Sequence, residues 1–107
     1  MAELLFEYAY FLWEENQFHL VEEPYTEALE IYRELAKTNP AAYLPDVADT
    51  LNNLAVLHDD NNRYEDAEKE YTEALKIYEA FAKYAPAKFQ PDVERVKYLL
   101  AELKGKK

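Results

Sequence analysis

Tyr25-Thr26-Glu27-Ala28-Leu29 recurs letter for letter, 46 residues later, as Tyr71-Thr72-Glu73-Ala74-Leu75. The match continues downstream, where Pro45-Asp46-Val47 returns at the same spacing as Pro91-Asp92-Val93. A fixed period of about 20–50 residues indicates a repeat array in which each unit buries its apolar face against its neighbours. The repeat therefore predicts a small solenoid, a kind of protein that works mostly by presenting a surface.

The composition predicts a chain that is almost entirely helical. Half of the 107 residues are hydrophobic, and the single glycine, Gly105, lies in the tail 104–107. Glycine weakens helices whereas Ala, Leu and Glu favour them, so an interior without glycine indicates helix. Apolar residues also recur at helical spacing in two stripes. The members of these stripes are Leu51, Leu54, Ala55, Leu57, His58, Ala67, Tyr71, Ala74, Leu75, Tyr78 and Ala82.

Shifting the second repeat unit by its period in both directions predicts the organisation of the whole chain. Pro45 and Pro91 are each expected to open a helix, because proline suits the first turn. The polar run 59–62 breaks the first of these helices, and another follows from about Tyr64 to the region of Ala85-Pro86. We expect one domain of five helices, divided into a first unit at about 1–40, a second unit at about 45–86 and a capping helix at about 91–104. The two helices of the first unit are expected at about 3–14 and 18–37. Loops between the units are expected at 38–44 and 85–90.

These residues resemble the tetratricopeptide repeat family. The second unit offers Leu54-Ala55 where two helices cross, followed by an Ala-aromatic-Ala set at Ala67, Tyr71 and Ala74. Small residues are needed at such crossings because they let helix axes approach closely. The first unit and the last helix match less fully, with Tyr8-Ala9, Val21, Tyr25, Ala28 and Leu100-Ala101.

The resemblance implies an all-α, right-handed α-solenoid that binds proteins or peptides without catalysis. The period of 46 exceeds the family's usual length of about 34 residues, which resembles the long-helix subclass of these repeats. A two-helix repeat of the HEAT type, whose period range includes this value, stays open as the alternative fold.

The first unit differs from the second mainly on one face. Phe6, Tyr10 and Trp13 stand where the second unit has polar or small residues, and their spacing places them together on one side of a helix. Three aromatic rings can expose several hundred Å², the size of patch that marks an interaction site. In the family, these positions line the concave groove. The predicted partner-binding residues are Phe6, Tyr10, Trp13, Glu14, Asn52, Val56 and Asp59.

Other interpretations of the aromatic face stay open. Pro24 suits the start of a helix, so residues 15–23 are alternatively a loop that folds over the rings. The same face can instead pair with a second copy of the chain in a homodimer, or border a pocket for an apolar small molecule. One unit near the family pattern beside another altered on one face is also typical of an engineered scaffold.

The charge of −10 limits the classes of partner. Nucleic acid and anionic membrane surfaces are disfavoured, because both need clustered Lys and Arg. Acidic residues along the predicted groove favour a partner with Lys or Arg, although a solvated edge would have the same composition. These residues are Glu3, Glu7, Glu14, Asp49, Asp59 and Asp60.

Neither an export signal nor a membrane anchor is predicted. The start Met1–Leu5 lacks the basic region of a signal peptide. No apolar run reaches membrane-spanning length. The absence of cysteine fits a reducing compartment, or a recombinant chain from which cysteine was excluded, so a cytoplasmic location or a recombinant origin is expected.

No catalytic, cofactor or metal site is expected. The chain has no Gly-rich phosphate loop and no nucleophile beside a base. His58 lies on an apolar stripe, so we interpret it as a core histidine with satisfied ring nitrogens. The acidic run 59–62 lacks the glycine and glutamate of a calcium loop. Asn52 has no lysine at the neighbouring groove positions, which include Tyr98 and Glu102, so no clamp for a terminal carboxylate is expected.

Overall fold

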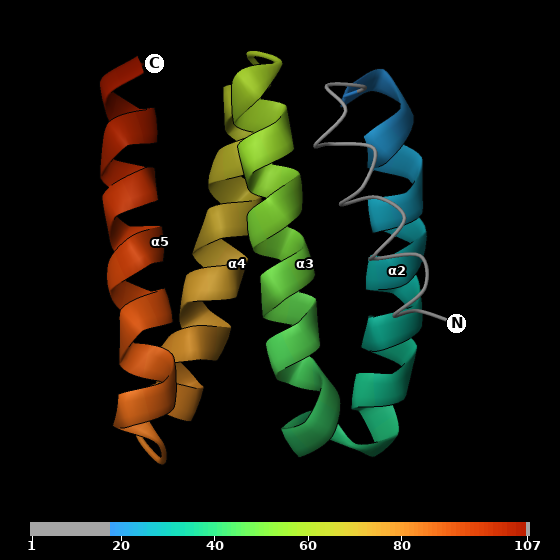
Figure 1. Cartoon of the computed structure of the whole chain (residues 1–107), viewed down its shortest axis with the longest axis vertical. Helices are drawn as coiled ribbons and strands as arrows, with labels where there is room; N and C mark the ends of the chain where they lie inside the picture. The colour runs from blue at the N-terminus through green and yellow to red at the C-terminus, as the bar shows by residue number, and fades with distance from the viewer. Residues whose placement is uncertain (1–17, 107) are drawn as a thin grey trace.

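The computed structural model describes residues 18–106, with side chains from Glu22 onward. These residues form α2 (Phe18–Thr38), α3 (Pro40–Asp60), α4 (Tyr64–Ala82) and α5 (Pro86–Lys106), as Figure 1 shows. The predicted all-α fold is confirmed for this part of the chain. The predicted count of five helices is wrong, because the described residues hold four helices and the helix expected at 3–14 lies outside them.

The helix boundaries settle one of the open alternatives. α2 already begins at Phe18, and Pro24 lies inside it instead of starting it. The alternative in which residues 15–23 form one loop is therefore wrong for 18–23. The helix predicted from about Tyr64 is confirmed by α4.

The loops between repeat units are shorter than predicted. α3 begins at Pro40 and α5 at Pro86, so the expected loops 38–44 and 85–90 are mostly helix. A proline at the first helical position costs nothing, since that N–H has no partner within the helix. Asn39 caps α3, where its Oδ1 accepts from the Ala42 N–H at 3.3 Å. Pro45 and Pro91, the expected start points, lie inside the helices.

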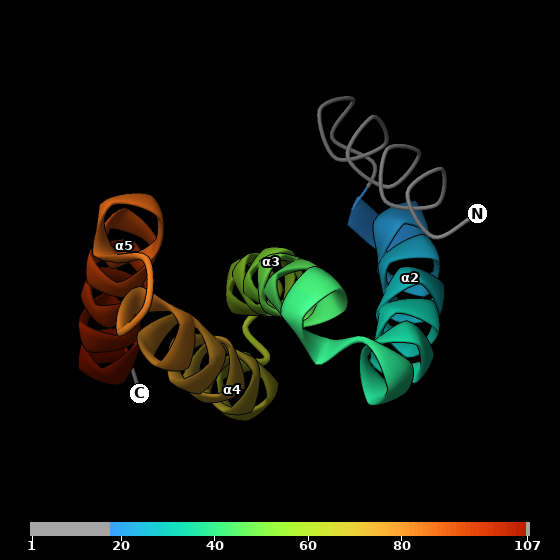
Figure 2. The same cartoon turned by 90° about the horizontal axis from the view of Figure 1, so that it is seen from below.

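The helices pack in chain order. α3 contacts α2 on one side and α4 on the other, and α4 in turn contacts α5. Viewed along the helices, α3 and α5 lie on the same side of α4 (Figure 2). This arrangement follows from the repeat, because α3 and α5 are equivalent helices of successive units. One face of the array is therefore built by α3 and α5, with α4 behind them.

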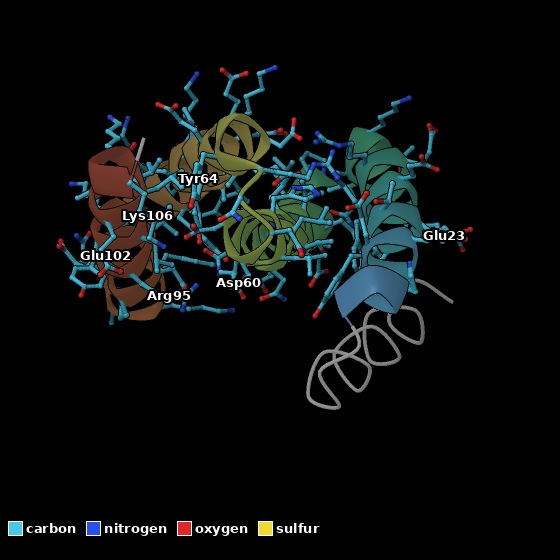
Figure 3. All side chains as sticks on the ribbon, turned by 90° about the horizontal axis from the view of Figure 1, so that it is seen from above. Glu23, Asp60, Tyr64, Arg95, Glu102 and Lys106 are labelled. Carbon is cyan, nitrogen blue, oxygen red and sulfur yellow. The ribbon has the colours of Figure 1, made fainter. Side chains whose placement is uncertain are left out.

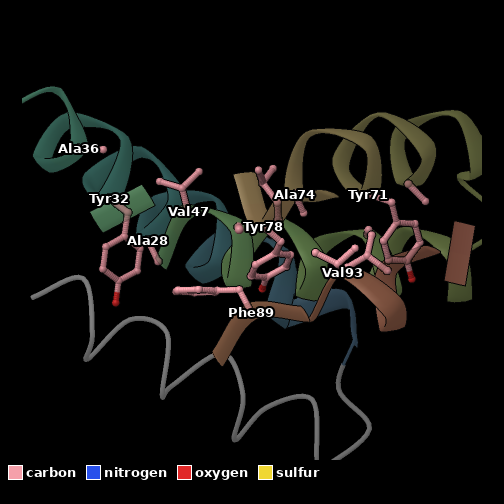
Figure 4. Close-up of a cluster of buried hydrophobic side chains, with 14 of the residues drawn as sticks. Ala28, Tyr32, Ala36, Val47, Tyr71, Ala74, Tyr78, Phe89 and Val93 are labelled. Atoms are coloured by element: carbon pink, nitrogen blue, oxygen red, sulfur yellow. The ribbon is translucent and has the colours of Figure 1, made fainter. Parts of the chain in front are cut away.

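The core combines tyrosine rings with alanines. Ala28, Ala55 and Ala74 are fully buried, as are the rings of Tyr25 and Tyr71. Figure 4 shows Ala28, Ala74 and Tyr71 among the buried side chains between the helices. Alanine lets the backbones approach, and the rings fill the space beside each crossing. The predicted stripes are confirmed: Leu51, Leu54, Ala55, Leu57, His58, Ala67, Tyr71, Ala74 and Tyr78 are buried, and Leu75 and Ala82 are partly buried.

Ala55 and Ala101 give a matched test of this packing, because they occupy the same position in successive units. Ala55 is buried under neighbouring helices, whereas Ala101 is exposed on α5. We expect Ala55→Leu to lower the free energy of unfolding by about 1–3 kcal/mol through overpacking. Ala101→Leu should change it by less than about 0.5 kcal/mol. Urea unfolding followed by circular dichroism measures both, and equal losses would contradict this account of the crossing.

Candidate functional site

A hollow of about 400 Å³ opens between α3 and α5. Its floor includes a side chain of α4, the helix that packs against both. Because α3 and α5 are equivalent helices, the hollow lies where two successive units meet. Its lining residues are Asp49, Asn52 and Asn53 of α3, Tyr78 of α4, and Asp92 and Arg95 of α5.

The Tyr78 hydroxyl and the Asp49 carboxylate join α4 to α3 within the hollow. Tyr78 is buried, and its hydroxyl donates a hydrogen bond to Asp49 Oδ1. Asp49 is exposed as a residue, but its carboxylate lies beside this buried ring, and the loss of hydration raises the pKa of Asp49. Burial also raises the pKa of Tyr78 well above its usual value. Tyr78 therefore stays protonated and holds Asp49 in place.

Asp92 and Arg95 form an ion pair on the α5 side of the hollow. Arg95 Nη2 lies 3.0 Å from Asp92 Oδ1, one helical turn away. Their side chains are a quarter and about half exposed, so the pair contributes little to stability. It does engage the only cation among the described residues that line the hollow. Figure 3 shows Arg95 on the side of α5 that faces α3.

Asn52 is the predicted site residue that the structure places in this hollow. The residue is 9% exposed, and its Oδ1 has no hydrogen-bond partner among the described residues. Buried amide oxygens normally have a partner, so an unpaired one needs an explanation. The location agrees with the expected groove position, while the binding role of Asn52 stays a prediction.

The other predicted site residues fall into three groups. Val56 lies one turn beyond Asn52 and is half-buried against the core. Asp59 forms an ion pair within the chain, since Lys106 Nζ of α5 lies 3.0 Å from its Oδ1. The described contacts therefore give Asp59 a structural role, which the sequence did not indicate. Phe6, Tyr10, Trp13 and Glu14 lie outside the described residues.

On α5, the equivalent groove positions carry an exposed tyrosine. Tyr98 corresponds to Asn52 and is 63% exposed. Its hydroxyl donates to Glu102 Oε2 at 3.2 Å. Position for position, the groove carries different residues in each unit, as expected if it contacts something irregular.

Several residues of the hollow were not predicted to belong to a site. The sequence predicts Asp49 only as part of an acidic rim, and Tyr78 only as a core residue. It predicts no binding role for Asn53, Asp92 or Arg95. One signal was available, since Arg95 stands at the position equivalent to Asp49 and reverses its charge.

A second cluster of charged groups surrounds His58 at the junction of α2, α3 and α4. His58 Nδ1 lies 2.7 Å from Glu70 Oε1, and its Nε2 lies 3.2 Å from Glu22 Oε2. A neutral imidazole has one N–H, so only the protonated ring donates to both carboxylates. The hydrogen bond to Glu70 is the main cause that raises the pKa of His58, opposed by burial. Arg63 Nη1 also contacts Glu22 at 3.0 Å.

The contacts of the His58 cluster give it a structural role. The predicted core histidine is confirmed, because His58 is 6% exposed and both ring nitrogens have partners. Within residues 18–106, no three His, Asp or Glu side chains gather as metal ligands. Over the same range, no helix combines the length and apolar character needed to cross a membrane.

A larger hollow of about 560 Å³ runs along α4 but is a weaker candidate. Its lining comes from α4 alone and alternates acidic and basic side chains on the helix surface. None of its lining residues has a buried polar atom without a partner. The hollow between α3 and α5 differs in that three helices build it, so it exists only in the folded array.

The comparisons with known proteins point to one family. A family profile described as tetratricopeptide repeat matches residues 1–80. That range covers most of the chain, including α2, α3 and nearly all of α4. No curated protein matches the chain closely enough to count as a relative.

The His58 cluster predicts a specific dependence of stability on pH. The pKa of His58 is raised in the folded state. Its contribution to stability is therefore complete below the pKa of histidine in the unfolded chain, about 6.5, and is lost as pH rises through the folded pKa. Burial also raises the pKa of Glu70, which acts in the same direction at lower pH. We expect the free energy of unfolding to fall above pH 6.5, and His58→Gln to flatten this part of the profile.

Urea unfolding at a series of pH values from 5 to 9 makes this measurement. An unchanged slope in His58→Gln would show that the cluster contributes nothing through its charge.

Proposed function

The chain belongs to the tetratricopeptide repeat family, and from this premise we propose that it is a non-catalytic module that binds a protein or peptide segment. Repeats of this family generally mediate protein–protein interaction. The proposed binding surface is the groove face, which we define as the residues that line the hollow between α3 and α5 together with Val56, Asp59, Tyr98 and Glu102. The long-repeat subclass, an engineered origin and a cytoplasmic location remain further predictions.

One observation supports the groove face above the rest of the surface. The hollow between α3 and α5 brings together side chains of three helices, and it contains a buried amide oxygen without a partner among the described residues. Binding sites are commonly concave, with a few polar groups that fix the orientation of the ligand. A peptide backbone supplies the N–H and C=O groups that such side chains can bind.

The aromatic residues of the first unit would supply apolar contact area. Phe6, Tyr10 and Trp13 share a face at helical spacing and stand at the repeat positions of Asn52, Val56 and Asp59. Burying several hundred Å² of aromatic surface at about 25 cal/mol/Å² would contribute on the order of 10 kcal/mol, before association costs of about 4–15 kcal/mol. Aromatic anchors of this kind dominate many interfaces. We place these residues, with Glu14, at one end of the bound segment.

Selection from a random peptide library on the full chain tests this function. We expect bound peptides, and we expect Tyr10→Ala and Trp13→Ala each to weaken their binding by about tenfold or more, because each removes an apolar anchor. Tyr84→Ala is the matched control, since that tyrosine is 90% exposed in the turn between α4 and α5. The control should bind like the original chain. Fluorescence anisotropy measures the peptide affinity of all three variants.

The variants also separate binding from folding and from self-association. Circular dichroism should show unchanged helicity in Trp13→Ala, whereas a collapse of the melting temperature would assign the ring to the core. Light scattering across a tenfold range of concentration should report the mass of one chain. A mass of two chains that falls to one in Trp13→Ala would replace the proposal by its alternative, a homodimer through the aromatic face.

A further inference from the structure

We propose that the hollow between α3 and α5 is a pocket for one cationic side chain, a lysine or an arginine, of the bound segment. This inference rests on the proposed function and names the chemistry of the partner. It is carried by the charges of the hollow, by its hydrogen-bonding groups and by the burial of Asn52. Each of these observations lies within the described residues.

The charges of the hollow are unbalanced toward the acidic side. Asp49 and Asp92 supply two carboxylates, and Arg95 supplies one guanidinium. Arg95 is engaged by Asp92 at 3.0 Å. No described lysine, arginine or histidine comes within ion-pair distance of Asp49. Asp49 is therefore a partly dehydrated carboxylate that Arg95 stabilises only at longer range, with no ion-pair partner among the described residues, and a cation of the partner would supply one.

The hydrogen-bond acceptors of the hollow are also only partly satisfied. Asp49 receives one hydrogen bond, from Tyr78, although a carboxylate can accept about four. Asn52 is nine-tenths buried, and its Oδ1 is unpaired within the described part of the chain. A half-turn of the side-chain amide exchanges the places of Oδ1 and Nδ2, so Asn52 can turn its oxygen toward a ligand. Ammonium and guanidinium groups carry only donors.

An anionic ligand would fit the hollow less well. It would have to compete with Asp92 for Arg95, and the carboxylate of Asp49 would repel it. The hollow of about 400 Å³ is much larger than the roughly 30 Å³ share of one water, so it can hold a side-chain head group with its water. A charge-assisted hydrogen bond to Asp49 would also give the partner a fixed register along the groove.

The test uses the full chain labelled with nitrogen-15 and two short probes. The first is the acetylated, amidated peptide Ala-Ala-Lys-Ala-Ala, and the second replaces its lysine by norleucine, which keeps the chain length and removes the charge. We expect the lysine peptide to shift the side-chain amide signals of Asn52 and Asn53, and the norleucine peptide to leave them unchanged. Equal shifts with both probes, or no shift with either, would overturn the pocket.

A matched pair of variants checks the role of the charge. Asp49→Asn keeps the shape of the side chain and should weaken binding of the lysine peptide about threefold or more. Glu65→Gln removes one charge from the exposed surface of α4 and should leave binding unchanged. Equal weakening in both would show a general effect of net charge and would also overturn the pocket. The comparison of the two probes needs no variant, so it holds even if Asp49→Asn fails to fold.

The outcome is separable from that of the proposed function. If library peptides bind while the lysine probe leaves the Asn52 and Asn53 signals unmoved, the module binds peptides but the cationic pocket is wrong. If the lysine probe shifts the Asn52 and Asn53 signals and the library yields no binder, the hollow takes a cationic side chain but the aromatic residues do not anchor a longer segment. Enrichment of Lys or Arg at one position of the selected peptides supports both.

Discussion

The close approach of helices at buried alanines is the constraint on which the rest of the structure depends. Ala28, Ala55, Ala67 and Ala74 are fully buried, and each lies where a larger side chain would push two helices apart. The tyrosine rings beside them fill space that alanine alone would leave empty. Because this pattern recurs at a constant period, each helix pair meets the next in the same geometry, and an array results instead of a closed bundle.

The groove face follows from this packing. Equivalent helices of successive units lie on the same side of α4, so α3 and α5 present their outer positions together (Figure 2). Positions at the helix crossings must hold small or aromatic residues. Positions on the groove face escape that requirement, which is why Asn52 and Tyr98 can differ although they are equivalent. The groove face can therefore vary between the units without disturbing the crossings.

Polar contacts lock the helices in register more than they hold the fold together. Arg33 of α2 contacts Glu73 of α4 through two hydrogen bonds of 2.6 and 3.0 Å, and Lys106 ties the end of α5 to Asp59. Such exposed pairs contribute little individually. The His58 cluster differs because the ring is buried, so its two carboxylate partners satisfy nitrogens that would otherwise be costly to dehydrate.

The sequence by itself determined the all-α fold, the repeat and the identity of the buried stripes, because periodicity and small-residue spacing are local properties that burial enforces. It misjudged where α3 and α5 begin, since Pro40 and Pro45 both satisfy the rule for a first turn and only the cap by Asn39 decides between them. Asn52 was found as a groove residue from its register. The pairing of Tyr78 with Asp49, the engagement of Asp59 by Lys106 and the joining of Asp92 and Arg95 with Asn52 in one hollow were decided only by the tertiary structure. The physical reason is that these contacts join side chains distant in the chain, and their geometry exists only once the helices have packed.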